Sequence, residues 1–241
     1  THRDLHSFPT RRSSELSILG KLYAVSGSGK ETPRIEVHGL LAYCSQSPWI
    51  LNSTLKDNIL FVHQYEEDFY RQTIEACQLL PDLEILLDGD NTFVGEKGIT
   101  LLGGQKARLA LARAVYSRAD VYLLDDVLLA VDSHVAKMIT ENVLSRSTGL
   151  LKTKTIVLVT NSLLVLPFSN NVSMLQSGRL IESGTYDEAR INHPNLAQLL
   201  SEFGRSAPVD FEKNDKIDTV DFSNSSSLIE SSDATAVSEE D

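Results

Sequence analysis

The sequence predicts an α/β domain with a mainly parallel sheet, a helical subdomain and an antiparallel edge. Residues 121–124 and 156–160 form apolar runs that indicate strands buried on both faces, and a helical pattern over residues 135–144 separates them. A further helical pattern over residues 105–116 precedes the first run. Alternation of strands and helices in this order is typical of a parallel sheet covered by helices.

The first half of the chain predicts a mixture of short elements. Residues 16–22 show the spacing of a helix end, and residues 34–38 and 40–43 indicate two short strands. Residues 54–61 predict a short helix after a capping run, and the apolar positions of residues 69–80 predict a longer helix that ends at Pro81. We interpret these two helices as a helical subdomain.

The second half continues with the helix at residues 105–116 and the strand at 121–124, which we expect to be central. After the helix at 135–144 and the strand at 156–160, residues 172–175 and 180–182 flank Ser177-Gly178 and predict a hairpin. A helix over residues 195–203 is expected to close the folded part.

Composition limits the classes of protein that the chain can represent. Its 241 residues are 41% hydrophobic and carry a net charge of −11, which suits a water-soluble core and gives no indication of nucleic-acid binding. We find neither an apolar run long enough for a membrane span nor the order of a signal peptide. Cys44 and Cys77 lack metal-ligand spacing, so we expect two reduced thiols and a cytosolic environment.

The two ends differ from the middle. Residues 1–15 read as a non-native or disordered leader, which we exclude from the fold. Residues 205–241 hold ten acidic and three basic residues, a net charge of −7, and are rich in serine. Such a composition predicts a disordered acidic linker.

Two motifs carry chemistry. The run Leu101-Leu102-Gly103-Gly104-Gln105 places paired glycines at the start of a helix, where exposed backbone amides can bind a phosphate. The strand at residues 121–124 ends in Asp125 and Asp126, which supply the carboxylates that the magnesium of a nucleotide requires.

With these motifs, residues 16–204 resemble the nucleotide-binding domain of an ABC transporter, a P-loop NTPase fold. Residues 44–49 resemble the Q-loop, residues 101–105 the signature motif, Asp125 the Walker B end, residues 130–132 the D-loop and Asn161 the switch position. The short sequence segments at residues 114–116, 123–126 and 131–135 resemble those of the first nucleotide-binding domain in transporters of the C subfamily, the multidrug-resistance type. Residues 152–162 are most similar to fungal vacuolar transporters of glutathione conjugates.

The resemblance implies ATP and Mg2+ as cofactors, the transmembrane domains of the same transporter as one partner, and a second ABC domain in a head-to-tail dimer as another. It also implies the cytosolic face of a membrane, expected to be vacuolar, and export of organic anions or glutathione conjugates. Metal binding would fall to Asp125 and Gln46. Catalytic roles would fall to Asp126, Gln46 and Asn161, and nucleotide contacts to Leu101, Leu102, Gly103, Gly104, Gln105 and Asp132.

Departures from the family pattern point to a degenerate site. Asp126 stands where a catalytic glutamate is expected, and Asn161 replaces a histidine, so hydrolysis should be weak. Leu102 replaces the signature serine, which would hydrogen-bond the nucleotide, and Leu129 replaces a D-loop serine. These changes leave open a non-hydrolysing, nucleotide-dependent scaffold. A soluble ABC protein that acts outside membranes is a further alternative.

The phosphate loop is the remaining question. Residues 27–30 read Gly-Ser-Gly-Lys, but Glu31 follows where a magnesium-binding hydroxyl is expected, and Pro33 leaves no room for a helix. We therefore interpret residues 16–22 as the remnant of the helix after the true Walker A loop. On this interpretation the domain is incomplete at its N-terminus.

Overall fold

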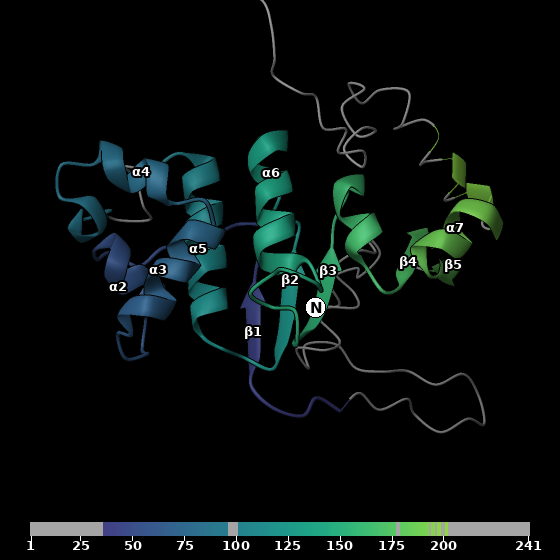
Figure 1. The fold of residues 1–241 in the computed structure, drawn as a ribbon, viewed down its shortest axis with the longest axis horizontal. Helices are drawn as coiled ribbons and strands as arrows, with labels where there is room; N and C mark the ends of the chain where they lie inside the picture. The colour runs from purple at the N-terminus through teal and green to yellow at the C-terminus, as the bar shows by residue number, and fades with distance from the viewer. Residues whose placement is uncertain are drawn as a thin grey trace, which may run out of the picture. The chain divides into compact units, whose positions relative to one another are not determined.

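A three-stranded parallel sheet forms the centre of the fold in the computed structural model, which describes residues 36–95, 101–176, 179–192, 194–195, 197–198 and 201. Strands β1 (Leu41–Cys44), β2 (Val121–Asp125) and β3 (Thr155–Val159) pair in the order β1-β2-β3. Figure 1 shows them side by side, with β2 between the other two. The predicted parallel sheet and the central place of β2 are confirmed.

Burial explains why β2 is central. The side chains of Tyr122, Leu123 and Leu124 are fully buried, whereas the residues of β3 are half-buried or exposed. A strand that is covered on both faces and paired along both edges must be apolar throughout, as residues 121–124 are.

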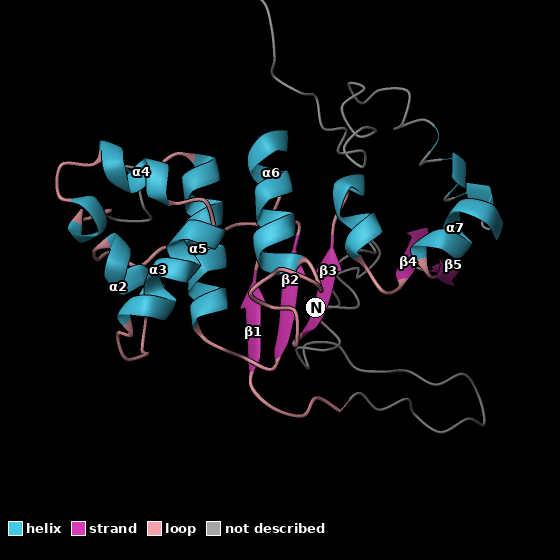
Figure 2. Ribbon diagram, viewed as in Figure 1, coloured by secondary structure: helices cyan, strands magenta, loops and turns pink. Residues whose placement is uncertain are grey.

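Four α-helices gather beside β1, where a helical subdomain of two helices was predicted (Figures 1 and 2). Helix α5 is the longest of them and packs against α2, α3 and β1. Its buried face includes Leu109, Ala112 and Val115, the apolar positions of the predicted helix. The four are α2 (Leu55–Leu60), α3 (Glu67–Ala76), α4 (Leu80–Ile85) and α5 (Gly103–Tyr116), with a 3-10 turn, η2 (Gly89–Asn91), between the last two.

The prediction of one helix over residues 69–80 that ends at Pro81 was wrong. Helix α3 ends at Ala76, and Gln78 has a positive φ of 57°, which an α-helix does not accommodate. Pro81 instead lies in the first turn of α4, where its missing N–H group and fixed φ are tolerated.

The prediction of a strand at residues 34–38 was also wrong for the described part of that range, because residues 36–38 are not in a strand. The chain turns at Gly39, whose φ is 98° and whose Cα lies against Asp120; a Cβ there would stand 2.4 Å from the Asp120 carboxylate. Only glycine allows this approach.

After β2 the chain forms α6 (Ser133–Ile139), which continues as a π-helical turn, η4 (Thr140–Leu144), where one helix was predicted. The Thr140 hydroxyl donates to the Ala136 carbonyl, and Ser145 N donates to the Thr140 carbonyl, five residues earlier. This wider hydrogen bond ends the helix. A 3-10 segment, η5 (Leu163–Phe168), follows β3.

The predicted hairpin is present as β4 (Val172–Gln176) and β5 (Arg179–Gly184), which pair antiparallel with an irregularity between Met174 and Leu175. Helix α7 (Tyr186–Asn192) follows and was missed. Its start is a capping box, since Thr185 N donates to the Glu188 carboxylate and Glu188 N donates to the Thr185 hydroxyl. Residues 194–195, 197–198 and 201 are helical, which supports the predicted closing helix.

Several predictions lie outside the described residues. These are the leader at residues 1–15, the helix remnant at 16–22, the Gly-Ser-Gly-Lys run at 27–30 and the acidic linker at 205–241. In the part of the chain that is described, no helix is both long enough and apolar enough to cross a bilayer.

Candidate functional site

Most of the predicted catalytic and metal-binding residues follow the carboxyl ends of the three parallel strands. Cys44 pairs in register with Leu124, and Asp125 pairs with Val159. Gln46 therefore follows β1, Asp125 ends β2 with Asp126 directly after it, and Asn161 follows β3 at the same edge of the sheet. Parallel strands present their ligand-binding loops at this edge, so the structure brings the four predicted residues to one side.

The two carboxylates of this edge differ in their environment. Asp125 is 5% exposed and ends β2 itself. Asp126 is 8% exposed, and its backbone N donates to the Val159 carbonyl over 2.7 Å. The Thr160 hydroxyl donates to Asp126 Oδ1 over 3.3 Å. Asp126 is thus attached to the end of β3 through both backbone and side chain.

Thr160 is a site residue that we did not single out from the sequence. Besides its bond to Asp126, its hydroxyl accepts a hydrogen bond from Ser162 N over 3.0 Å, so it orders the turn that contains Asn161. A hydroxyl residue directly after a buried strand and before the switch position was the available signal.

Asp126 has a positive φ of 52°, in the left-handed region. Aspartate and asparagine enter this region more readily than other residues with a Cβ, because their short polar side chains bond locally. The turn after β2 therefore favours aspartate over glutamate at this position on conformational grounds alone.

Oxygen donors at this edge suit a magnesium ion bound to a nucleotide. Mg2+ prefers carboxylate and amide oxygens and commonly takes one or two of them, together with phosphate oxygens and water. Asp125 and Gln46 supply that donor set. Among the described residues, no group of three or more His, Cys, Asp or Glu side chains is placed to hold a metal ion by itself.

The signature run forms the start of α5. Leu101 is buried, while Leu102 is 75% exposed and precedes the first helical residue. A Cβ added at Gly103 would meet nothing within 4 Å, so its backbone is open to a ligand. A Cβ at Gly104 would lie 2.9 Å from the Ala130 carbonyl oxygen, so Gly104 permits the close packing of α5 on the loop after β2.

A set of polar contacts fixes the start of α5 to α4. Gln105 Oε1 accepts from Leu102 N over 2.8 Å, and Gln105 Nε2 donates to Asp82 Oδ1 over 3.0 Å. Arg108 pairs with Asp82 at 3.0 Å, and its guanidinium also donates to the Gln78 carbonyl. The predicted signature residues Leu101 to Gln105 are therefore held in one defined turn.

Asp132 caps α6. Its Oδ1 accepts from Val135 N over 3.0 Å, and this hydrogen bond holds the pKa of the carboxyl below its usual range. The side chain is exposed and belongs to the same loop as Ala130, against which Gly104 packs. The structure thus connects the D-loop to the signature turn, as two neighbouring elements.

The Q-loop connects the sheet to the helical subdomain. Gln46 is exposed two residues after β1. Trp49 is 57% exposed, and its ring centroid lies 6.0 Å from that of Phe61, with the two rings nearly perpendicular. Arg113 of α5 donates to the Trp49 carbonyl and to the Asn58 carbonyl, each over 2.7 Å. These bonds couple the Q-loop to α2 and α5.

A groove of about 730 Å³ runs beside β3. Apolar side chains of β3, η5 and β4 line it, and Thr160 and Asn161 contribute to its wall. Its lining includes Ile156, Leu158, Leu163, Val165, Val172 and Met174.

Together, the parallel sheet, the carboxylates at its carboxyl edge and the glycine-opened helix define a nucleotide-binding domain of the P-loop NTPase class. A family model described as ABC transporter matches residues 15–128. The chain belongs to the ABC transporter family, which confirms the fold class and the resemblance drawn from the motifs.

The relatives are C-subfamily transporters. Bile pigment transporter 1 of Saccharomyces cerevisiae is 52% identical over 199 residues, 80% of this chain and 13% of its own length. Metal resistance protein YCF1 of the same yeast is 47% identical over 243 residues, 90% of this chain and 16% of its own length. Human ATP-binding cassette sub-family C member 2 is 46% identical over 195 residues, 80% of this chain and 12% of its own. The chain thus spans a small part of each relative.

Proposed function

We propose that this chain is a nucleotide-binding domain of an ATP-driven exporter and forms the weakly hydrolysing member of a pair of domains. The observation that carries this proposal is the meeting of Gln46, Asp125, Asp126 and Asn161 at the carboxyl edge of one parallel sheet. Parallel α/β sheets bind their ligands at this edge.

Each residue has a role in the proposal. Asp125 and Gln46 would hold the Mg2+ of the nucleotide, because they supply the oxygen donors at the strand ends. Asp126 would occupy the position of the general base, oriented by Thr160. Asn161 would meet the γ-phosphate. ATP, once bound, supplies the phosphoryl group whose transfer to water drives the cycle.

The signature turn would serve a second nucleotide. Gly103 and Gly104 present backbone amides at the positive end of α5, and the open space at Gly103 lets a phosphate approach. Because this turn is on α5 and not at the carboxyl edge of the sheet, its nucleotide would come from a second ABC domain in a head-to-tail dimer. Gln46 would report the occupied state to transmembrane helices, the other proposed partner.

The weak hydrolysis follows from two residues. Aspartate at position 126 is one methylene shorter than glutamate, which withdraws the carboxylate from an attacking water by about 1 Å and costs on the order of 100-fold in rate. Asn161 cannot carry the positive charge that a protonated histidine offers to the γ-phosphate.

Cargo and location are proposed from the relatives. Their names include a bile pigment transporter, a metal resistance protein and a vacuolar heme exporter of Schizosaccharomyces pombe. Bile pigments and heme are organic anions, and one relative is named as vacuolar, so the names support export of organic anions across a vacuolar membrane. Glutathione conjugates as cargo, and the cytosolic side for this domain, are proposed from the resemblance of the motifs.

The test uses membrane vesicles from cells that express the full-length gene product. We expect uptake of a glutathione conjugate that depends on Mg2+ and ATP, and we expect Asp125→Asn to abolish it. Uptake in the absence of ATP, or full uptake by Asp125→Asn, would contradict the proposal.

The scaffold alternative is supported by Leu102, Asp126 and Asn161: Leu102 and Asn161 lack a ligand-binding or catalytic atom, and Asp126 withdraws its carboxylate from the water. It predicts that the purified gene product binds Mg2+ and ATP and drives no uptake. A soluble ABC protein is the remaining alternative, and a gene product without membrane spans would favour it.

A further inference from the structure

Three hydrogen bonds hold Asp126 at the end of the sheet. Its backbone N donates to the Val159 carbonyl over 2.7 Å, and its own carbonyl accepts from Leu129 N over 3.1 Å. The third bond comes from the Thr160 hydroxyl, which donates to Asp126 Oδ1 over 3.3 Å. The two backbone bonds fix the main chain of Asp126 at its φ of 52°, and the bond from Thr160 restricts the direction of its carboxylate.

The Thr160 hydroxyl is engaged on both sides. Its oxygen accepts from Ser162 N over 3.0 Å, while its hydrogen is directed to Asp126. A hydroxyl has one proton to donate, and a donor on its oxygen polarises the O–H bond and strengthens the bond that it gives. The direction of the hydroxyl is therefore set by a backbone amide on the far side of Asn161.

This arrangement differs from a turn that is ordered only locally. A hydroxyl that did no more than order the turn before η5 would accept from Ser162 N and need not donate to a carboxylate. Thr160 does both, because the register that pairs Asp125 with Val159 places the residues after the two strands side by side. Since Asp126 is 8% exposed, little water competes for the bond from Thr160.

The bond also distinguishes the two oxygens of the Asp126 carboxylate. Oδ1 is held by Thr160, and no residue in the described part of the chain donates to Oδ2. A carboxylate fixed through one oxygen can present the other to a water molecule in a constant direction. The attacking water gives its proton to such an oxygen in general base catalysis.

We propose that Thr160 is a positioning residue for ATP hydrolysis, which directs the Asp126 carboxylate toward the attacking water and keeps the turn at Asn161 aligned with it. This inference rests on the proposed function. Without the hydroxyl the carboxylate rotates, so the base is correctly placed for a fraction of the time. Because hydrolysis depends steeply on the placement of the base, we expect a loss of about tenfold in rate.

The experiment measures single-turnover ATP hydrolysis by the purified full-length gene product at several ATP concentrations. The slow phase should belong to this site, and Asp126→Asn should slow it by about 100-fold or more. Thr160→Val keeps the branched shape and removes the hydroxyl. It should slow the same phase about tenfold and leave the ATP concentration at half-maximal rate unchanged, because Thr160 acts on the base and not on the nucleotide. A raised half-maximal concentration with an unchanged rate would assign Thr160 to binding and overturn the inference.

A conservative variant and a matched control test whether the hydroxyl itself is responsible. Thr160→Ser keeps both hydrogen bonds and should recover most of the rate that Thr160→Val loses. Thr73 of α3 is fully buried, and its hydroxyl donates to the Phe69 carbonyl over 2.7 Å. Thr73→Val therefore makes the same chemical change away from the site and should hydrolyse ATP at the parent rate. An equal loss in Thr73→Val would assign the effect to lower stability and overturn the inference.

A double variant shows whether Thr160 acts through Asp126. If it does, Thr160→Val combined with Asp126→Asn should hydrolyse no more slowly than Asp126→Asn alone, because the group that Thr160 positions is already lost. A further tenfold loss would show another route and overturn the inference. If Asp126→Asn slows the phase and Thr160→Val does not, the inference fails and the proposed function stands. If Asp126→Asn changes nothing, Asp126 does not act as the base, and the proposed role and the inference fail together.

Discussion

The Cα atom of Gly104 lies so close to the Ala130 carbonyl that a Cβ on residue 104 would be 2.9 Å from that oxygen. The contact joins the start of α5 to the loop between β2 and α6. Since the opposing atom belongs to the backbone, relief requires the two elements to separate. The neighbouring Gly103 has no such contact, so the two glycines have different roles.

We predict opposite effects on stability for alanine at these two positions. Gly104→Ala should destabilise the fold by about 1 to 3 kcal/mol, because the packed backbone must shift. Gly103→Ala should stabilise it by up to about 1 kcal/mol, because alanine reduces the entropy of the unfolded chain at no steric cost. Thermal unfolding of the two variants without nucleotide measures the difference. Equal midpoints would contradict the assigned contact.

Leu102→Ser should stabilise the nucleotide-free protein. The backbone at residue 102 already has the conformation of a capping serine, and Gln105 already supplies its half of the capping box. A serine hydroxyl there should contribute about 1 kcal/mol to the free energy of unfolding. Chemical denaturation measures it, with Leu87→Ser, a change at a fully exposed leucine after α4, as the control for added surface polarity. A midpoint no higher than that of the control would show that residue 102 does not act as the N-cap of α5.

Asp126→Glu should combine faster hydrolysis with lower stability. The added methylene returns the carboxylate toward the position of a catalytic base, which we expect to raise the hydrolysis rate at this site by up to about 100-fold. Glutamate is less suited to the φ of 52° and cannot keep the same bond to Thr160, so the fold should lose on the order of 1 kcal/mol. Single-turnover hydrolysis and thermal unfolding measure the two effects. An unchanged rate would show that the length of the side chain at position 126 is not what limits the hydrolysis rate at this site.

Arg113→Lys should loosen the Q-loop. The guanidinium donates to the Trp49 carbonyl and to both the backbone and side-chain oxygens of Asn58, which is fully buried. A single ammonium group cannot make all three bonds in this geometry, so we expect a loss of about 1 to 3 kcal/mol. Thermal unfolding measures the loss, and the fluorescence of Trp49, the one tryptophan of the chain, reports its position. An unchanged spectrum and midpoint would contradict this prediction.

Strong local patterns made most of the fold predictable from the sequence. The fully apolar run at residues 121–124 identified the central strand, and the helix predicted at residues 105–116 is α5, which begins two residues earlier, at Gly103. The order of the motifs along the chain then identified the family. The pairing of the strands brings the residues that follow them to one edge of the sheet. The register that pairs Asp125 with Val159 places Asp126 beside Thr160.

The wrong predictions concern the places where one local signal had two meanings. A proline can follow the end of a helix or lie in the first turn of one. The positive φ of Gln78 interrupts the helical backbone before Pro81, so Pro81 lies in the first turn of α4. Residues 36–38 alternate like a strand, but Gly39 turns the chain against Asp120 before pairing begins. Such outcomes depend on tertiary contacts that a single sequence does not display.

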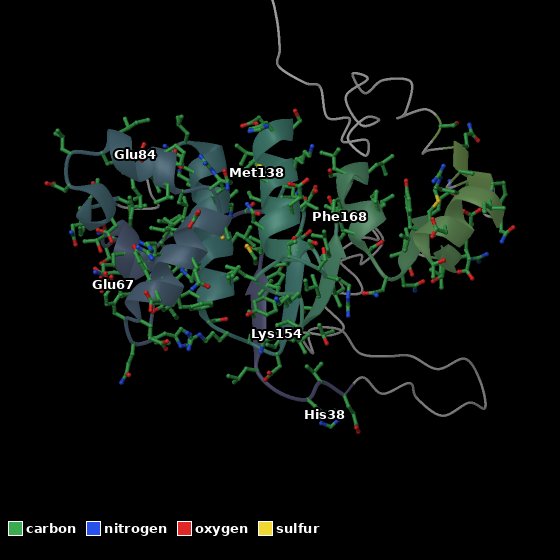
Figure 3. The ribbon with its side chains drawn as sticks, in the orientation of Figure 1. His38, Glu67, Glu84, Met138, Lys154 and Phe168 are labelled. Atoms are coloured by element: carbon green, nitrogen blue, oxygen red, sulfur yellow. The ribbon has the colours of Figure 1, made fainter. Side chains whose placement is uncertain are left out.

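Two charged side chains meet at the amino-terminal edge of the sheet. Asp120 lies there before β2, and its carboxylate accepts from Leu40 N over 2.9 Å and pairs with Lys154 at 3.4 Å. Figure 3 labels Lys154 at this end of β3. The hydrogen bond from Leu40 lowers the pKa of Asp120 first, and Lys154 lowers it further.

A carboxyl whose pKa is lower in the folded state stabilises the fold above its unfolded pKa, near 3.8, and this stabilisation is lost as the pH falls through the folded pKa. Asp120→Asn can still accept from Leu40 N but cannot titrate. We therefore expect the variant to be less stable at pH 7, and we expect the difference from the parent protein to shrink as the pH falls below about 4. Thermal midpoints between pH 7 and pH 3 measure this convergence. A constant difference across that range would show that the charge of Asp120 does not contribute, and that only its shape and its bond to Leu40 matter.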